Sequence, residues 1–437
     1  MALPLPSRYP ESLLQYAWQH RRYHAQSLLT TEGQPVCVVR PGTWNAGAGP
    51  DFLQAQVRIG KLEFHGHVEL HVAGADWYTH GHATDPAYNP VVLHVVAQPS
   101  VTPPRRADGS RVPEVVLGDR LDPALLLRYG KLVATEGRLP CAAFFAEVPV
   151  VAKNVWFTSL GHARLLEKAE HHRATWVAAA HDWRQALWVA LAGAMGGPTN
   201  RPAFETLAQR VPYTLLAQHR DQPLALEALL LGAAGLLESP EDDYAQQLAQ
   251  QWAHYGRLHQ LTPLAPGVVS FGRMRPAAFP SLRLAQLAAI AGQRTDWLAL
   301  LTATTAELGQ WLQVPPSAYW QHHYRLGVPT ARPIRGGLGQ AQVHHLLINT
   351  LLPFAVLYHT ERGDYAAVEA AGEQLAGLPH EAHALARLYA GLGYRAPSAL
   401  HTQGAVHLHR HYCQPRACLR CTVGHHILQP TDDHART

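Results

Sequence analysis

The chain has 437 residues, of which 47% are hydrophobic and 16% charged, and its formal net charge is +4. These values exclude an intrinsically disordered chain, and the small net charge excludes a protein that is basic throughout. The length predicts two or three domains rather than one core. A compositional bias explains most of the 29 histidines as well as a function does.

No stretch of the sequence has the length and apolarity of a membrane anchor or a secretory signal. The longest apolar run, residues 228–237, is about half as long as a transmembrane helix. Residues 1–8 lack the apolar core of a signal peptide. The five cysteines are not spaced like the disulfide framework of a secreted protein. We therefore expect a cytoplasmic protein without membrane contact.

The first part of the chain, residues 1–135, alternates between helical and strand-like patterns. Apolar residues at helical spacing predict a helix, β-branched runs predict strands, and Gly60-Lys61 predicts a tight turn. This order of elements predicts an α/β domain with a mixed central sheet. The elements are a helix at 10–18, strands at 35–40, 52–59 and 62–73, a polar loop or short helix at 74–89, and a buried strand at 91–96.

The rest of the chain has a different character. From about residue 150, alanine and leucine recur at three- and four-residue spacing, with proline and glycine between the runs. This pattern predicts a mostly α-helical domain over residues 150–410, followed by a cysteine-rich tail at 411–437. The fold class of the whole chain is therefore predicted to be α+β.

Two acidic residues stand out in the predicted hairpin. Asp51 precedes its first strand, and Glu69 lies eighteen residues later in the second strand. Acids on neighbouring strands can hold a divalent cation between them, and hard oxygen ligands suit Mg²⁺ or Mn²⁺. Such an ion can activate water and neutralise charge at a phosphodiester. We predict a metal site at Asp51 and Glu69.

Histidines accompany Glu69 along the same strand. His65, His67 and His71 alternate with apolar residues, so that they face the same side of the strand as Glu69. Such a row is as readily a solvated face as the lining of a cleft, in which Asp51 and His94 would join it.

A second group of histidines follows the hairpin. His80 and His82, with Asp85, are candidates for a nitrogen-rich site that would take zinc or manganese. The spacing of two histidines alone is a weak signal, and their interpretation as ordinary loop residues stays open.

The tail carries a further pattern of metal ligands. Cys413, Cys418 and Cys421 favour zinc or an iron–sulfur cluster over disulfides, although incidental buried thiols are an alternative. A fourth ligand is required, and Cys141 would tie the tail to the end of the first domain. The candidates for this fourth ligand are Cys141, His411, His425 and His426.

Arginines are concentrated in one short stretch of the helical region. Arg273, Arg275 and Arg283 lie within eleven residues, and arginine suits bidentate contacts with phosphate. We expect them to be candidates for nucleic-acid binding, with a solvated helix face or internal ion pairs as the alternatives.

The acidic pair and the order of elements resemble the PD-(D/E)XK nuclease superfamily. The resemblance is carried by Pro50-Asp51, by Glu69-Leu70-His71 and by Glu11 on the first helix. It implies a restriction-endonuclease-like domain in which Asp51 and Glu69 hold the metal and Glu11 assists. His71 stands where the superfamily has lysine, so the resemblance places it near the attacking water; a neutral histidine can accept a proton or bind metal, but it is not a fixed positive charge.

Over nearly its full length the chain resembles an uncharacterised bacterial family, domain of unknown function 2851. The resemblance supplies no activity. The segments that carry it are 49–52, 66–71, Asp76-Trp77 with His80 and His82, 88–89, 93–96, 227–230, 273–276, 279–280, 283–286 and the terminal cysteines.

We therefore expect a Mg²⁺- or Mn²⁺-dependent phosphodiesterase that acts on DNA or RNA. One alternative is a catalytically inactive scaffold of the nuclease fold that binds nucleic acid or protein. Another is a histidine-ligated metallohydrolase of a small molecule.

Overall fold

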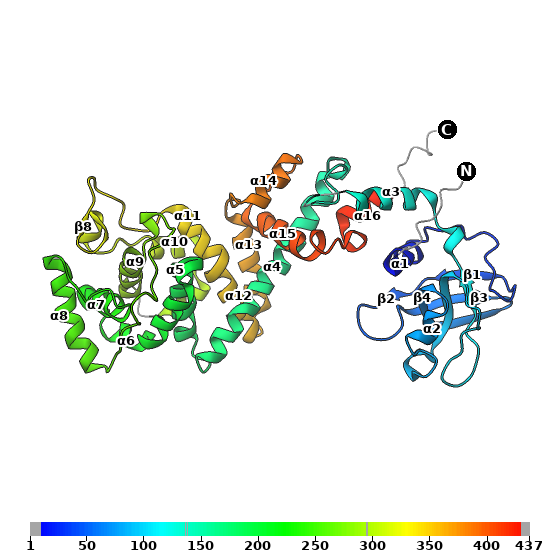
Figure 1. Ribbon diagram of the computed structural model, residues 1–437, viewed down its shortest axis with the longest axis horizontal. Helices are drawn as coiled ribbons and strands as arrows, with labels where there is room; N and C mark the ends of the chain where they lie inside the picture. Colours follow the sequence, from blue (N-terminus) through cyan, green and yellow to red (C-terminus); the bar gives the residue numbers. More distant parts are fainter. Residues whose placement is uncertain (1–9, 136, 138, 294–295, 430–437) are drawn as a thin grey trace. The chain divides into compact units, whose positions relative to one another are not determined.

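The computed structural model describes residues 10–135, 137, 139–293 and 296–429, and it divides the chain into two compact units (Figure 1). The first, here called the sheet unit, consists of Met1–Lys153 together with His409–Thr437. The second, the helical unit, is Asn154–Leu408. The cysteine-rich tail, which the sequence analysis treated as a separate segment, thus groups with the N-terminal residues.

The sheet unit contains the predicted strands and several short helices. The strands predicted at 52–59 and 62–73 are confirmed as β3 and β4. Two further strands, β2 and β6, were not predicted because they are only two and three residues long. The elements are α1 (Glu11–Gln19), β1 (Val36–Arg40), β2 (Thr43–Trp44), β3 (Phe52–Ile59), β4 (Leu62–Ala73), α2 (Asp76–Thr79), η1 (Pro86–Tyr88), β5 (Val91–Gln98), β6 (Glu114–Val116), η2 (Gly118–Arg120), α3 (Pro123–Ala134), η3 (Phe145–Glu147), η8 (His409–Cys413), η9 (Cys418–Arg420) and α16 (Thr422–Leu428).

Within the described residues, six strands form one sheet. The sheet is mixed, as predicted. Its order is β1-β3-β4-β5-β6, and β2 pairs with β3. Strand β3 runs antiparallel to β1 and β4, whereas β4, β5 and β6 are parallel to one another. One central strand therefore opposes the direction of all its companions in the main path of the sheet.

The hydrophobic residues of the sheet explain why it is stable. Val57, Val68, Leu70, Leu93 and Val95 are completely buried, and each lies in a β-branched or leucine-rich run of the kind that fits a pleated surface. Burial of such a side chain contributes about 1.5–3 kcal/mol. The same alternation that buries these residues directs the neighbouring polar residues of β4 to the other face.

Helix α1 and the tail both pack within the sheet unit. Helix α1 begins after the extended Pro10 and packs on β4 with its apolar side. The hydroxyl of Tyr16 lies 2.9 Å from His425 Nδ1, and Arg22 donates a hydrogen bond of 2.7 Å to the carbonyl oxygen of Leu428. These contacts join the two ends of the described chain in one unit.

The helical unit has an extensive core of buried leucine, alanine and tryptophan side chains, which confirms the predicted helical region. Helix α4 starts within the sheet unit and continues into the helical unit. The elements are α4 (Val150–Ala178), α5 (Trp183–Arg210), α6 (Tyr213–Gln218), α7 (Pro223–Ala233), α8 (Asp243–Leu258), η4 (Pro276–Ala278), α9 (Pro280–Gln293), η5 (Trp297–Thr302), α10 (Thr305–Leu312), η6 (Ala318–Gln321), β7 (His323–Arg325), β8 (Val328–Pro329), α11 (Gln340–Leu346), η7 (Leu347–Leu351), α12 (Leu352–Glu361), α13 (Tyr365–Gly377), α14 (Ala384–Gly391) and α15 (Ala399–Leu408).

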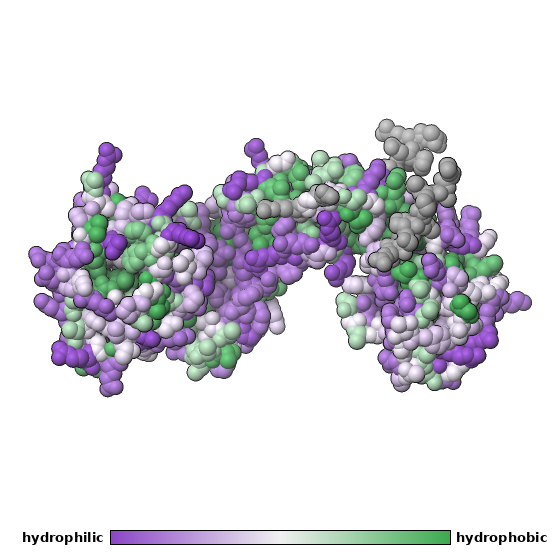
Figure 2. Space-filling model, viewed as in Figure 1, coloured by the Kyte–Doolittle hydropathy of each residue, from purple (hydrophilic) through white to green (hydrophobic). Residues whose placement is uncertain are grey.

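The surface of each unit is mixed in polarity. Figure 2 shows hydrophilic residues over much of the visible face of each unit, with hydrophobic residues in smaller groups between them. Among the described residues, no helix has both the length and the apolar character needed to cross a bilayer.

Candidate metal centre

The two acids predicted to share a metal lie side by side at one end of the β3–β4 hairpin. Asp51 directly precedes β3, and the register pairs Phe52 with Val68, next to Glu69. The main-chain N–H of Asp51 donates to Glu69 Oε2 at 3.0 Å. In return, the N–H of Leu70 donates to Asp51 Oδ2 at 3.1 Å. These reciprocal bonds hold the two carboxylates together before any ligand binds.

Helix α1 adds a third acid and an amide to this site. Glu11 and Gln15 are one helical turn apart, so they project from the same face of α1. The amide of Gln15 donates to Asp51 Oδ1 at 2.9 Å and to Glu11 Oε1 at 3.3 Å. Gln15 thereby links the acid of the helix to the acid of the hairpin.

The clustering of acids changes the protonation of Asp51. Burial and the neighbouring charge of Glu69 raise the pKa of Asp51 to about 7, and the hydrogen bond from Gln15 only partly opposes this rise. Burial and the same Glu69 charge also raise the pKa of Glu11. Accumulated negative charge of this kind is relieved when a cation binds.

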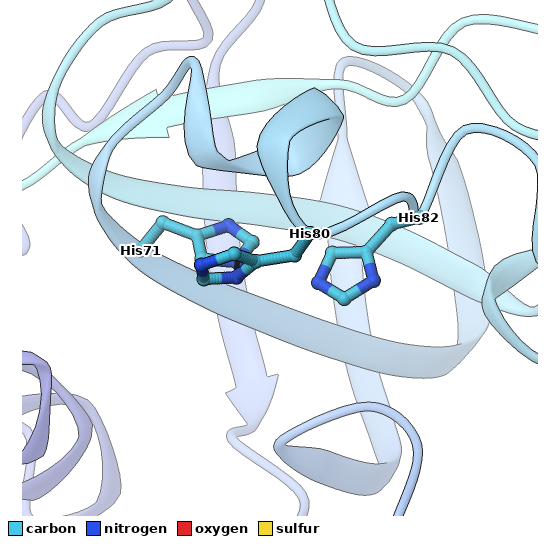
Figure 3. A group of neighbouring side chains, drawn as sticks. All are labelled: His71, His80 and His82. Atoms are coloured by element: carbon cyan, nitrogen blue, oxygen red, sulfur yellow. Dashed lines mark hydrogen bonds between the residues drawn. The ribbon is translucent and has the colours of Figure 1, made fainter.

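Three histidines converge beside Glu69. His71 projects from β4, whereas His80 and His82 come from the segment after α2, and Figure 3 shows the three rings gathered between these elements. One ring nitrogen from each histidine lies within 4.8 Å of those of the other two. His71 Nε2 is 3.2 Å from His80 Nδ1 and 3.6 Å from Glu69 Oε1. His82 Nε2 is 3.2 Å from the same oxygen of Glu69.

A tight loop brings His80 and His82 to this place. Gly81, between them, has a φ of +80°, a conformation that glycine adopts without steric cost. The His82 ring stacks on Tyr88 with ring centres 3.7 Å apart, and it also contacts the buried Trp77. Trp77 and Tyr88 therefore pack against His82 and fix the position of its ring.

His71 is also the first member of a buried chain of polar groups. Its Nδ1 lies 2.9 Å from His94 Nε2, and His94 Nδ1 lies 3.0 Å from Glu114 Oε2. Ser100 donates its hydroxyl and its main-chain N–H to the two oxygens of Glu114. Of these residues, His71, His94 and Glu114 are each no more than 2% exposed.

Burial shifts the pKa values of His71 and Glu114, the two ends of this series of polar groups, in opposite directions. It lowers the pKa of His71 well below its usual range, and the nearby His94 adds to the effect, so His71 is neutral. For Glu114, burial would raise the pKa, but the hydrogen bonds from His94 and Ser100 outweigh it and lower the pKa. Glu114 is therefore an ionised carboxylate that accepts hydrogen bonds.

Other residues singled out in the sequence lie away from this centre. His65 is exposed, and His67 accepts a hydrogen bond from the N–H of Gln54 at 3.3 Å. Asp85 accepts from the N–H of Ala87 at 2.9 Å and so caps η1. Lys61 is exposed in the turn at the opposite end of the hairpin from Asp51, too far to replace the missing lysine.

The arginine candidates belong to the helical unit. Arg273 and Arg275 are exposed before η4, and Arg273 has a positive φ of 58°. Arg283 lies in α9 and donates to Gln286 at 3.0 Å. Burial lowers the pKa of Arg283 to about 10.

The four candidate cysteine ligands all belong to the sheet unit. Cys413, Cys418 and Cys421 are buried, and all of the cysteines are present as thiols. Burial and the neighbouring Cys413, Cys421 and Cys418 all raise the pKa of Cys141. Burial and Cys421 raise the pKa of Cys418 to about 11. In the described part of the chain, no group of three ligands within 4.8 Å of one another includes a cysteine.

Sequence reasoning missed three residues of the acidic and histidine cluster. Gln15 could have been found from its spacing of four residues from Glu11. Glu114 and Ser100 carried no comparable signal, because their position depends on a parallel strand pairing of only three residues.

The fold and the cluster define a mixed α+β protein with a buried acid–histidine centre in its sheet unit. The chain belongs to the family described as "Protein of unknown function (DUF2851)", whose model matches residues 11–384. No curated protein and no solved structure matches the chain.

Proposed function

We propose that the protein is a divalent-metal-dependent phosphodiesterase that acts on DNA or RNA. The observation that carries this proposal is the convergence of Glu11, Asp51 and Glu69 at one end of the β3–β4 hairpin. The three acids are linked through Gln15 and through the hydrogen bonds between Asp51 and Glu69, although their carboxylate oxygens do not all lie within 4.8 Å of one another. Their mutual repulsion is relieved when protons or a metal ion bind.

The topology supports the same proposal. The PD-(D/E)XK resemblance implies an acid before the second strand of a mixed sheet, an acid on the third strand and one on the first helix. Asp51, Glu69 and Glu11 occupy those places, if the two-residue β2 is left out of the strand count.

The donor set fits a cation. His82 Nε2 is buried and makes no hydrogen bond, although it lies 3.2 Å from Glu69 Oε1. A bound divalent cation would supply Lewis acidity and an activated water at the phosphodiester. Asp51 and Glu69 would hold it, Glu11 would orient a solvent molecule beside them, and Gln15 would keep Asp51 in place.

His71 takes the position at which the resemblance implies lysine. A lysine would contribute a fixed positive charge, whereas His71 is neutral and offers a lone pair. This replacement distinguishes the chain from the superfamily pattern and shifts the site toward nitrogen ligation. The histidine-ligated metallohydrolase and the nuclease therefore share one site, because His80 and His82 lie against Glu69 and His71.

The proposal is tested by assaying cleavage of labelled single- and double-stranded DNA and RNA with Mg²⁺, Mn²⁺ or Zn²⁺. We expect Asp51→Ala and Glu69→Ala each to reduce cleavage by about 10²–10³-fold, equivalent to about 3–4 kcal/mol of activation free energy. Glu63→Ala is the control, because Glu63 is an exposed acid on the same strand. Cleavage that survives both substitutions would contradict the assignment.

The inactive scaffold predicts a different result in the same assay. It predicts salt-sensitive binding of nucleic acid that does not change when Asp51 and Glu69 are replaced. Arg273, Arg275 and Arg283 are the candidates for that binding, and their replacement should reduce the salt dependence by about one phosphate contact each.

We also propose that Cys141, Cys413, Cys418 and Cys421 hold a second metal group. Four thiolates around one zinc ion at about 2.3 Å would lie about 3.8 Å apart. Zinc and iron–sulfur clusters are both held by cysteine thiolates, so either group suits this ligand set.

The cysteine proposal is tested by metal analysis and visible absorption of protein purified without oxygen. We expect bound zinc, or bound iron with a visible absorption band. Either signal should be lost in Cys418→Ser and retained in Cys37→Ser, which alters an exposed cysteine. Bound zinc without iron would leave the ligands in place but exclude the cluster. Wild-type protein without either metal would exclude the site.

A further inference from the structure

Four donor atoms from two chain segments, strand β4 and the loop after α2, lie near one another in the sheet unit. They are Glu69 Oε1, His71 Nε2, His80 Nδ1 and His82 Nε2. The measured separations are 3.2 Å from His71 to His80, 3.6 Å from His71 to Glu69, and 3.2 Å from His82 to Glu69. Four ligands arranged tetrahedrally at about 2.0–2.1 Å from one ion are about 3.3–3.4 Å apart. These three separations are close to the tetrahedral spacing, and the ligand atoms of the three histidines all lie within 4.8 Å of one another, a group that does not include Glu69.

The hydrogen-bond chain behind His71 fixes which of its nitrogens carries the proton. Glu114 is an ionised carboxylate, so it accepts a proton donated by His94 Nδ1. When His94 carries a single proton, on Nδ1, its Nε2 has a lone pair, and the His71 Nδ1 that lies 2.9 Å away donates to it. His71 Nε2 is consequently left without a proton, and its lone pair points toward Glu69, His80 and His82.

The sheet register makes this chain possible. Glu69 on β4 pairs with His94 on β5, and His94 pairs with Glu114 on β6. Residues paired in this way share a face of the sheet, and His71 lies on the same face two residues after Glu69. The metal ligands and the groups that orient them are therefore held by one rigid surface.

We infer that Glu69, His71, His80 and His82 bind a single transition-metal ion, with Glu114 and His94 as positioning residues that set the tautomer of His71. The inference rests on the proposed function only in placing a metal at Glu69. It replaces Asp51 by three histidines as the other ligands and so narrows the class of metal. Three imidazoles and one carboxylate suit zinc, or manganese in its place, whereas Mg²⁺ prefers oxygen ligands and retains its water.

Metal binding requires one local change of protonation. His80 Nδ1 lies 3.2 Å from His71 Nε2, so the two nitrogens share one proton when no ion is bound. An ion that takes both lone pairs requires the proton of His80 on Nε2, and the exposure of His80 gives solvent access for this exchange. His71 needs no such change because its lone pair is already in place.

The experiment measures metal binding alone. Full-length protein is stripped of weakly held metal with a chelator and then titrated calorimetrically with ZnCl₂, MnCl₂ or MgCl₂. Sites are assigned by the difference between the wild type and the His80→Ala/His82→Ala variant, so that metal at the cysteines cancels. His65→Ala is the matched control, because His65 is an exposed histidine on β4.

We expect the double histidine variant to lose one zinc ion per chain and His65→Ala to lose none. Glu114→Gln should weaken zinc binding by about 10–100-fold, the usual effect of removing a partner behind a metal-bound histidine. Thermal unfolding of metal-free Glu114→Gln checks its folding. If that variant unfolds, Ser100→Ala, which removes one donor to Glu114, should show a smaller loss in the same direction.

Equal zinc stoichiometry in the wild type and the double histidine variant would overturn the inference, and so would Mg²⁺ binding as tight as that of zinc. Unchanged zinc affinity in a folded Glu114→Gln variant would overturn the role of the hydrogen-bond chain. Zinc binding as expected, with no cleavage of nucleic acid by the loaded protein, would contradict the proposed function and leave this inference standing.

Discussion

Each unit contains a buried carboxylate that accepts several hydrogen bonds. The two carboxylates differ in the residues that their donors contact in turn. Glu114 in the sheet unit and Glu227 in the helical unit are 2% and 3% exposed. Glu227 accepts from Tyr244 and from the indole of Trp320, each at 2.8 Å. Burial raises the pKa of Glu227 despite these bonds, whereas the hydrogen bonds to Glu114 outweigh burial and lower its pKa.

Glu114 and Glu227 differ in the last group of their hydrogen-bond networks, and that last group decides whether a buried acid contributes to a site. The partners of Glu227 are the side chains of tyrosine and tryptophan and a main-chain N–H of Ser317, and together they join α7 to α8 and η6. The network of Glu114 continues through His94, which can donate on one side and accept on the other, and ends at a lone pair of His71. The first network connects helices, and the second ends at a ring nitrogen of the proposed metal site.

The largest expected effect would come from removing Glu227. Glu227→Ala leaves the buried donors of Trp320, Tyr244 and Ser317 without their acceptor, at a cost of about 1–3 kcal/mol for each one not rescued by water. We expect the free energy of unfolding of the helical unit to fall by about 3–5 kcal/mol, measured by urea denaturation, while zinc binding stays unchanged. Glu238→Ala, at an exposed position, should change stability by no more than about 0.5 kcal/mol. A loss of zinc binding in Glu227→Ala would break the distinction between the two networks.

The next effect concerns pH and Asp51. The pKa of Asp51 rises from its ordinary value of 3.8 to about 7 in the folded chain. As the pH rises, the carboxyl group of Asp51 therefore ionises in the unfolded chain before it ionises in the folded chain. The contribution of Asp51 to the stability of the metal-free protein should therefore be lost between about pH 4 and pH 7, and at about 1.4 kcal/mol per pKa unit it is at most about 4.5 kcal/mol. Asp51→Asn should remove this part of the pH dependence in urea denaturation with chelator present. An identical pH profile for the variant would show that Asp51 ionises normally.

The smallest effect would come from weakening the network of Glu114 without breaking it. Ser100→Ala removes the hydroxyl that donates to Glu114 Oε2 at 2.6 Å but keeps the main-chain donor. We expect a loss of about 1 kcal/mol in stability and a less than tenfold loss of zinc affinity by calorimetry. A larger loss of affinity than in Glu114→Gln would contradict the order of the chain, because Ser100 lies farther from the metal.

The sequence predicted the parts of the fold that depend on local patterns. Strands β3 and β4 follow from alternation around Gly60, and the hairpin then places Asp51 near Glu69. Pairing between β5 and β6 could not be predicted, because a three-residue strand has no periodicity to detect and its partner is distant in sequence. Glu114 was missed for this reason.

The joining of the two histidine groups was also beyond the sequence. The spacing of His80 and His82 predicts a separate nitrogen-rich site, whereas in the structure both residues lie beside Glu69 and His71. Their position depends on the turn at Gly81 and on the packing of Trp77 and Tyr88, which are tertiary features. In the tail, the spacing of the cysteines was visible in the sequence, whereas the proximity of Cys141 required the chain to return to its first unit.

This return has a consequence for the synthesis of the protein. The sheet unit is interrupted by the whole helical unit, about 250 residues long. At about 5–20 residues per second, the ribosome takes roughly 10–50 s to make this insertion. Tyr16 and Arg22 must wait that long for their partners His425 and Leu428, and Cys141 for the cysteines of the tail. The unit that emerges first is thus completed last, and a nascent chain stalled before residue 409 would present an unfinished sheet unit to chaperones and proteases.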